Sequence, residues 1–438
     1  MYLFSNYQIT KSNYFSLLIS LLPISFIAGN MIININVILL ILSCLIIYPK
    51  EIFKIHFHIL DKLMISFFLL IIFSGVYNDF KLFKFYQEFY STRELNSTVK
   101  SILFLKYLFF YFVTRFLIEK KYVNLSLFFL ICFICSIFVC FDIFIQFIFG
   151  KDIFGYEMIK GRLGGPFGDE LIAGGYIQRF SIFSFFLLPL FFSKYSKNFN
   201  KYFTPILFLI FFLGIILSGN RMPLLLFLFS LSLICIFQKQ TRKLFFPFVI
   251  IFSVIFTAIY KSNDQIKIHF QSFFENSVNI VVGISNKEFD KKYTPQYLKE
   301  FASFYDTWLM NKYFGGGIKN FRFYCHERPN IKKDSKFICN MHPHNYYLEI
   351  LTETGIVGFT IISLIFFVVL YISFIKKYFL LSSLNNNNLI IPFIFLFIAE
   401  IFPFKSTGSF FTSGNATYLF LILGILIGLT RKNNLIEN

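Results

Sequence analysis

The sequence predicts an all-α, polytopic membrane protein with about twelve transmembrane helices and one large helical extracytoplasmic loop. The first observation is composition, because 56% of the 438 residues are hydrophobic and only 15% are charged. Soluble domains carry roughly a quarter of charged residues. The second is a mean hydropathy of +0.67. The third is that the apolar residues form separate runs, each close to the roughly 20 residues that a helix needs to cross a bilayer.

About twelve apolar runs satisfy this length criterion. In chain order they are residues 14–29, 31–48, 60–77, 101–118, 122–149, 177–193, 203–218, 222–237, 244–260, 349–374, 388–404 and 416–430. Gly29 and Asn30 join the first two runs, which therefore form either a helical hairpin or one broken helix. The first run is followed at once by another and lacks a small-residue cleavage pattern, so we do not expect a cleavable signal peptide.

Basic residues give the expected orientation. If the N-terminus lies inside the cell, the clusters of Lys and Arg between spans fall on that same side, as the positive-inside rule requires. They are Lys50/Lys54/Lys62, Lys120/Lys121, Lys194/Lys197/Lys201, Lys239/Arg242/Lys243, Lys376/Lys377 and Arg431/Lys432. Topology therefore explains the formal net charge of +18, and we expect no nucleic acid partner.

This orientation divides the chain into three parts. Residues 1–260 form an N-terminal transmembrane bundle of about nine spans, 261–348 form a large outer loop with a catalytic cap, and 349–438 form the C-terminal transmembrane helices. The outer loop holds four of the six histidines. Its excess of basic residues suits an anionic ligand or a lipid surface, or is simply a solvated face. The shorter segments on the same side are 78–100, 151–176, 218–221 and 405–415, so chemistry is expected to face outward.

Cysteine usage separates two residues from the rest. Cys325 and Cys339 lie in polar sequence on the outer side, whereas the other five of the seven cysteines lie in apolar runs. In an oxidising compartment a disulfide between them would close a loop of about fifteen residues and contribute about 3 kcal/mol; the alternative is two unpaired thiols. The neighbouring His326, His342 and His344 lack the ligand spacing of a zinc site, so no metal is predicted.

His344 is the strongest candidate for catalysis. It stands at the outer mouth of a helix that is predicted to start near Asn345 and to run into the membrane. A neutral imidazole at that place can accept a proton from a hydroxyl group near neutral pH. The alternative is that His344 is a helix cap or a surface residue.

Arginines on the outer side are candidates for binding a phosphate or diphosphate. Arg221 starts a predicted helix, where backbone N–H groups also favour an anion; the alternative is an interfacial anchor. Arg162 lies in a Gly-rich loop that permits close approach of the backbone to a ligand. Arg322 and Arg328, in the large outer loop, could also reach an anion.

Two further features lie near Arg162. Asp169 and Glu170 either bind an acceptor or are carboxylates at the start of a helix. Arg179 follows inside an apolar run, so it needs a partner or water if it faces inward.

Three blocks of sequence carry a resemblance to a known family. They are Ser218-Gly219-Asn220-Arg221 before an apolar helix, the Gly-rich segment 311–321, and His344-Asn345 with Glu353, Gly355 and Gly358. Together with the loop 162–170, these blocks resemble the O-antigen ligase and O-antigen polymerase superfamily of bacterial envelope glycosyltransferases. The chain departs from the family at Asn220, where Ser is usual. It also has a second histidine, His342, beside His344, and the following Asn345 indicates that His344 is the family's histidine.

The resemblance implies a lipid-linked glycan transferase of the bacterial inner membrane with its active site facing the periplasm. Members of the family move a glycan from undecaprenyl diphosphate to a sugar hydroxyl, without a nucleotide sugar, a metal or another cofactor. The implied partners are an undecaprenyl-diphosphate-linked glycan donor, a lipid A core or growing glycan acceptor, and the lipid bilayer. A chain-length regulator is a further candidate partner.

The resemblance also implies roles for individual residues. His344 would help to deprotonate the acceptor hydroxyl. Arg221 and Arg162 would neutralise the diphosphate as its charge grows on departure, with Arg322 and Arg328 as further contributors. The secondary candidates are His342, Asn345, Glu353 and Asp169.

Rival functions differ in acceptor or in class. A ligase transfers to the lipid A core and a polymerase to another carrier-linked repeat, and the sequence leaves both open, together with transfer to a protein. From another class, charges such as Lys106, Asp142 and Glu400 raise a flippase or transporter for the lipid-linked glycan. Transporters tend to show paired repeats. We see no internal repeat in this chain, so glycan transfer is favoured.

Overall fold

The structure is a computed structural model, and it describes residues 11–86, 96–159, 161–187, 197–238, 242, 245–262, 264–286, 296–325, 339, 344–380 and 389–431. These residues form helices without a β-strand, and the only β-pairing among them is two isolated bridges. The predicted all-α class is confirmed.

The helices follow one another along the whole described chain. They are α1 (Lys11–Ser20), α2 (Leu22–Ala28), α3 (Asn30–Ile47), α4 (Pro49–Ile52), α5 (Ile59–Tyr86), α6 (Asn96–Phe104), α7 (Lys106–Glu119), α8 (Leu125–Phe149), η1 (Gly165–Phe167), α9 (Ala173–Phe180), η2 (Ser181–Phe186), α11 (Lys197–Leu217), α12 (Arg221–Phe237), α13 (Phe245–Ser262), α14 (Asp264–Asn286), α15 (Gln296–Met310), α16 (Phe321–Tyr324), α17 (Tyr346–Leu370), η4 (Tyr371–Leu380), α18 (Ile390–Glu400) and α19 (Ser413–Arg431).

The described residues include seven helical stretches that are long and apolar enough to cross a membrane. Three further apolar helices are shorter: Phe203–Leu217, Arg221–Phe237 and Ile390–Glu400. The polytopic architecture is therefore confirmed, but the count of about twelve full-length spans is not. One reason is local, because the predicted run 177–193 is interrupted: α9 ends at Phe180 and the chain continues as 3-10 turns.

The first two apolar runs form a helical hairpin. Gly29 separates α2 from α3 with a φ of 103°, a conformation that suits glycine. Hydrogen bonds join Tyr14 to Ser43 at 2.7 Å and Asn36 to Ser25 at 3.0 Å, so the two arms run antiparallel.

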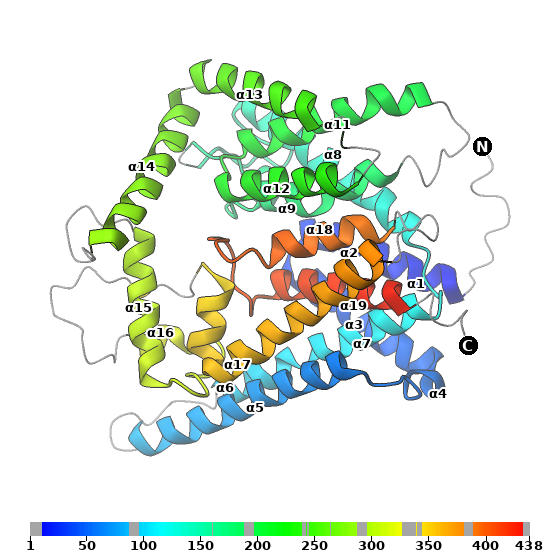
Figure 1. The fold of residues 1–438 in the computed structure, drawn as a ribbon, viewed down its shortest axis with the longest axis vertical. Helices are drawn as coiled ribbons and strands as arrows, with labels where there is room; N and C mark the ends of the chain where they lie inside the picture. The colour runs from blue at the N-terminus through cyan, green and yellow to red at the C-terminus, as the bar shows by residue number, and fades with distance from the viewer. Residues whose placement is uncertain are drawn as a thin grey trace.

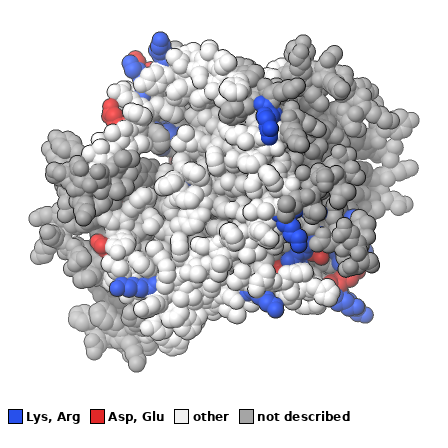
Figure 2. All heavy atoms as spheres, viewed as in Figure 1, with Lys and Arg blue, Asp and Glu red and all other residues white. Residues whose placement is uncertain are grey.

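Figure 1 shows how the long helices lie relative to the outer loop. Helices α5, α7 and α17 cross the view, while α14 and α15 stand across their ends at the left. The start of α1, the short α4 and the end of α19 lie at the opposite side, on the right. Figure 2 shows mostly uncharged side chains over the middle of the same face, with charged residues toward its left and right margins. This distribution is the one expected for a protein embedded in a bilayer.

A buried ion cluster joins α5, α7 and α19. Arg115 is fully buried, and its Nη1 lies 2.6 Å from Oδ1 of Asp61. Tyr111 donates a hydrogen bond to the same carboxylate at 2.9 Å, and Arg431 approaches it at 3.6 Å. Because an unpaired buried charge is costly, the cluster fixes these three helices relative to one another.

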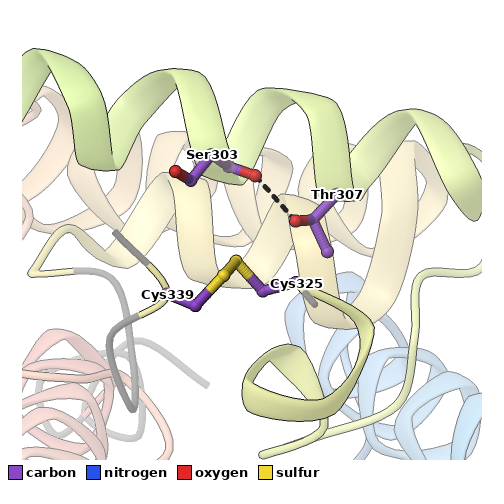
Figure 3. The surroundings of a disulfide bond; sticks show 4 residues. All are labelled: Ser303, Thr307, Cys325 and Cys339. Carbon is purple, nitrogen blue, oxygen red and sulfur yellow. Dashed lines mark hydrogen bonds between the residues drawn. A yellow bond between two sulfur atoms is a disulfide. The ribbon is translucent and has the colours of Figure 1, made fainter. Parts of the chain in front are cut away.

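The described part of the large outer loop is helical. A disulfide joins Cys325, just after α16, to Cys339. Figure 3 shows it under α15, near Ser303 and Thr307. Cys325 is fully buried with Phe304 of α15 and Phe321 of α16 in one apolar cluster. The disulfide therefore holds Cys339 against α15 and α16. The domain boundaries at residues 260 and 348 remain predictions.

Candidate active site

A cavity of about 960 Å³ opens among segments that are far apart in the sequence. Its walls come from the hinge between α2 and α3, the loop before α9, the turn before α12, the start of α17, and the connection from α18 to α19. The polar and charged side chains that line it include Arg162, Glu170, Arg179, Asn220, His344 and Lys405. In Figure 1 the connection from α18 to α19 lies at the same end of the helices as α14 and α15.

The loop that carries Arg162 is held by two polar side chains of α8. Gln146 accepts a hydrogen bond from the backbone N–H of Gly165 at 2.9 Å, and its amide donates to the carbonyl of Tyr156 at 3.1 Å. Asp142 accepts one from the N–H of Ile153 at 2.9 Å. These bonds use Oδ1 of Asp142 and the whole amide of Gln146 to hold the loop against α8, while Oδ2 of Asp142 is buried without a hydrogen-bond partner among the described residues.

Arg162 packs against the turn that precedes α12. Gly219 has a φ of 70°, and a Cβ built on it would lie 3.0 Å from Cγ of Arg162. Asn220 closes the turn by donating to the carbonyl and the hydroxyl of Ser218, both at 3.0 Å. Two of the blocks that sequence analysis singled out therefore meet here. Among the described residues, none forms a hydrogen bond or ion pair with the guanidinium group of Arg162.

His344 reaches the cavity from the residue before a helix cap. The side chain of Asn345 accepts hydrogen bonds from the N–H groups of Tyr347 and Leu348, so it caps α17. Its amide also donates to the carbonyl of Pro403 at 2.7 Å. Asn345 is therefore a positioning residue, which fixes the backbone next to His344 and ties it to the connection after α18.

A charged network lies beneath the cavity. Glu400 is 1% exposed and receives Arg179 at 2.8 Å, Lys405 at 2.6 Å and the hydroxyl of Tyr346 at 2.6 Å. Arg179 also donates to Asn415 at 2.7 Å. Since two cations share one carboxylate, this network contributes an excess of positive charge to the wall of the cavity.

The protonation of Lys405 is sensitive to its surroundings. Burial lowers the pKa of its ammonium group to about 8, an effect that the carboxylate of Glu400 opposes and that Arg179 reinforces. Lys405 is therefore a cation at neutral pH that loses its charge in mildly alkaline solution.

Away from the cavity, backbone hydrogen bonds join the Gly-rich segment to Thr352 and Glu353 of α17, and we call this contact the clasp. Gly316 donates its N–H to the carbonyl of Thr352, and Gly317 donates to that of Glu353, both at 2.9 Å. Gly355 has a φ of 68° and interrupts α17, which frees these carbonyls. A Cβ at Gly315 would lie 2.3 Å from the carbonyl carbon of Glu353, so the contact requires glycine.

A comparison with known families supports the resemblance carried by these blocks. Residues 206–363 match the family model described as O-antigen ligase. This part of the chain belongs to the O-antigen ligase and polymerase superfamily. The match includes the turn 218–221, the Gly-rich segment and the motif of α17, and it ends before the connection from α18 to α19. No curated protein gives a significant match to the chain.

The structure does not bring all predicted site residues to the cavity. Arg221 is absent from the lining, and its Nη2 donates to Oγ of Ser272 in α14 at 3.1 Å. Arg322 also lies elsewhere, where it donates to the carbonyl of Lys319 at 3.3 Å. Asp169 is exposed outside the lining, and Glu353 is buried in the clasp. Arg328 and His342 lie outside the described residues.

The sequence does not indicate one residue of this site. That residue is Lys405, and the sequence indicates Arg179 only as a charge that needs a partner. The available signal was the composition of the segment 405–415, where a single lysine stands among Ser, Thr and Gly on the outer side. Such a segment combines a charge with small hydrogen-bonding residues, as anion-binding loops do.

Proposed function

We propose that this membrane enzyme transfers a glycan from undecaprenyl diphosphate to a sugar hydroxyl, and that the reaction takes place in the cavity at His344. The observation that carries the proposal is the convergence of Arg162, Asn220 and His344 on one cavity. They come from blocks far apart in the chain, and each block resembles a family motif. A structural role alone gives no reason for an arginine, a polar turn and a histidine to face the same space.

The chemistry of the donor explains the positive charge. When the bond from the sugar to the diphosphate breaks, negative charge grows on the leaving oxygen, and fixed cations nearby stabilise it. Arg162 is suited to this role, since no described residue engages its guanidinium group. Arg221 belongs to the same turn as the cavity-lining Asn220, and we assign it to the approach of the diphosphate. We assign Arg322 and Arg328 to binding of the donor from the side of the large outer loop.

His344 is proposed as the general base. It would take the proton of the acceptor hydroxyl while the acceptor oxygen bonds to the anomeric carbon. A single displacement of this kind inverts the configuration at that carbon. We assign His342 and Asp169 no step in this reaction.

The acceptor is proposed to be either the lipid A core, for a ligase, or a growing carrier-linked glycan, for a polymerase. The enzyme would work in the bacterial inner membrane with the cavity facing the periplasm, where both lipid-linked substrates are accessible. A chain-length regulator would be a partner only of the polymerase.

A strain lacking only this gene tests the proposal. Its lipopolysaccharide is separated on gels, and carrier-linked intermediates are extracted from its membranes. Bare core with long glycan stranded on the carrier supports a ligase, and core with a single repeat supports a polymerase. Unchanged lipopolysaccharide together with unchanged carrier intermediates would contradict both.

A further inference from the structure

The connection between α18 and α19 forms one wall of the cavity. Lys405, Ser406, Thr407, Gly408 and Ser409 all line it, on the same cavity as His344. The segment lies outside residues 206–363, so the family match gives it no role.

This segment presents hydrogen-bond donors that no described residue of the protein uses. Among the described residues, none accepts a hydrogen bond from the backbone N–H groups of Ser406, Thr407 or Gly408. The hydroxyl groups of Ser406 and Thr407 likewise have no partner there. Gly408 has a φ of 80°, and backbone turns of this kind direct successive N–H groups into one concavity that suits an anion.

Lys405 adds a positive charge at the start of the segment. It is 5% exposed, and it donates to Glu400 at 2.6 Å and to the hydroxyl of Tyr346 at 3.2 Å. An ammonium group has three N–H donors, so one remains for a ligand in the cavity.

Hydrogen bonds hold the C-terminal end of the segment, at Ser409 and Phe410. The buried carboxylate of Glu349 accepts hydrogen bonds from the hydroxyl of Ser409 and from the N–H of Phe410. Asn415 donates to the carbonyl of Ser409 at 2.8 Å. The loop is therefore anchored at both ends while its middle residues line the cavity, and such preorganisation lowers the cost of binding an anion.

We propose that the Lys405–Ser409 loop binds a phosphoryl group of the lipid-linked donor. Lys405 supplies the charge, and the donors of Ser406, Thr407 and Gly408 supply hydrogen bonds to the phosphoryl oxygens. The identity of the ligand as a donor diphosphate rests on the proposed function. In the reaction the acceptor oxygen bonds to the anomeric carbon and gives its proton to His344. The bond from that carbon to the diphosphate breaks, and its electron pair leaves on the diphosphate oxygen beside the loop.

The test uses the purified full-length protein and inorganic pyrophosphate, with affinity measured by titration calorimetry. Two variants separate binding from folding. Lys405→Gln removes the charge, and the double variant Ser406→Ala with Thr407→Val removes only hydroxyl groups that no described residue contacts. Lys151→Gln, an exposed lysine outside the cavity lining, is the control for a general loss of charge.

We expect each loop variant to weaken pyrophosphate binding by about tenfold or more, because each hydrogen bond to a charged ligand is worth about tenfold in affinity. Lys405→Arg should retain most of the affinity, and Lys151→Gln should equal the wild-type protein. Equal affinity in the wild-type protein and the double hydroxyl variant would overturn the proposal. So would the failure of the wild-type protein to bind pyrophosphate at millimolar concentration.

Competition identifies the source of the phosphoryl group. Displacement of pyrophosphate by undecaprenyl diphosphate is the expected result, and displacement by phosphorylated lipid A alone would overturn the assignment to the donor. The outcomes also separate the two proposals. If the loop variants lose pyrophosphate while the deletion strain keeps normal lipopolysaccharide, the proposed function fails and the anion site remains. If the strain is defective but the variants bind normally, only the loop assignment fails.

Discussion

The side chain of Arg162 lies against Gly219, with its Cγ 3.0 Å from the place that a Cβ would occupy. This contact joins the Gly-rich loop before α9 to the turn before α12. It also orients the one arginine of the cavity whose guanidinium group has no partner among the described residues.

Replacement of Gly219 by alanine should therefore impair transfer by displacing Arg162. A φ of 70° also strains an alanine by about 1–2 kcal/mol. Gly150→Ala is a matched control, because Gly150 has a φ of 78° and a Cβ there would meet nothing within 4 Å. We expect both variants to lose similar stability, while Gly219→Ala alone lowers transfer on the order of tenfold or more. Equal transfer rates in purified Gly219→Ala and Gly150→Ala proteins would contradict this.

The clasp between the Gly-rich segment and α17 should be a determinant of stability. At Gly315 a Cβ would lie 2.3 Å from the backbone of Glu353, so Gly315→Ala should cost about 3 kcal/mol from strain and overpacking. Gly155→Ala, with a φ of 88° and open space around the Cβ, should cost only about 1 kcal/mol. Thermal unfolding in detergent measures both. A melting temperature for Gly315→Ala equal to that of Gly155→Ala would show that the clasp tolerates a side chain.

Transfer should fall as the pH rises through the range near 8. Lys405 has a pKa of about 8, because burial lowers it most, Glu400 raises it and Arg179 lowers it further. The side chain is therefore charged below that pH and neutral above it. The groups that face it are Glu400, Arg179 and Tyr346. The rate constant kcat/KM for the donor reports the free enzyme and should decline above pH 8. Lys405→Arg should move this decline to higher pH. If kcat/KM of that variant declined at the same pH as in the wild-type protein, Lys405 would not be the cause of the decline.

The same lysine has the opposite effect on stability. Its pKa in the unfolded chain is near 10.5, above the folded value of about 8, so the unfolded state binds more protons between these values. The contribution of Lys405 to the free energy of unfolding therefore rises with pH in that interval. Activity and stability should diverge on the alkaline side, which distinguishes loss of charge at Lys405 from alkaline unfolding.

The disulfide should stabilise the outer loop. Cys325 and Cys339 are 14 residues apart, and closing a loop of this size contributes about 3 kcal/mol. The double variant Cys325→Ser with Cys339→Ser should melt at a lower temperature than the wild-type protein. Reductant should lower the melting temperature of the wild-type protein and leave that of the double variant unchanged. A wild-type protein that is insensitive to reductant under unfolding conditions would argue against a stabilising bond.

The sequence predicted the membrane-embedded architecture because hydropathy and basic flanks act locally. The errors at helix ends are small and have local causes. The run predicted to begin at 122 begins as a helix at Leu125, because Asn124 caps it by accepting from the N–H of Ser126. By contrast, the helix predicted to start near Asn345 begins at Tyr346, with Asn345 as its cap.

The charged network of Arg179, Glu400 and Lys405 could not be predicted from such local patterns. Arg179 and Glu400 lie 221 residues apart, and their pairing depends on the fold that brings the end of α9 to Glu400 and to Tyr418 of α19. Their charges were visible in the sequence, but their partnership was not. The role of Lys405 could not be predicted from the sequence, because it depends on the fold that brings the segment after α18 to the same cavity as His344.

Side-chain direction was the other limit. The sequence placed Arg221 at the start of a helix, as the structure does. Its side chain nevertheless bonds to Ser272 of α14 and does not line the cavity. The same holds for Arg322, because a position on the outer side does not specify which space a long side chain enters.

The central claim is that His344 acts as the base in glycan transfer at this cavity. The most direct measurement is the rate of transfer from an undecaprenyl-diphosphate-linked glycan by the purified full-length His344→Ala protein. The account predicts a rate lowered by roughly 100- to 10,000-fold, with pyrophosphate affinity and melting temperature close to those of the wild-type protein. A folded His344→Ala protein that transfers glycan at the wild-type rate would contradict it.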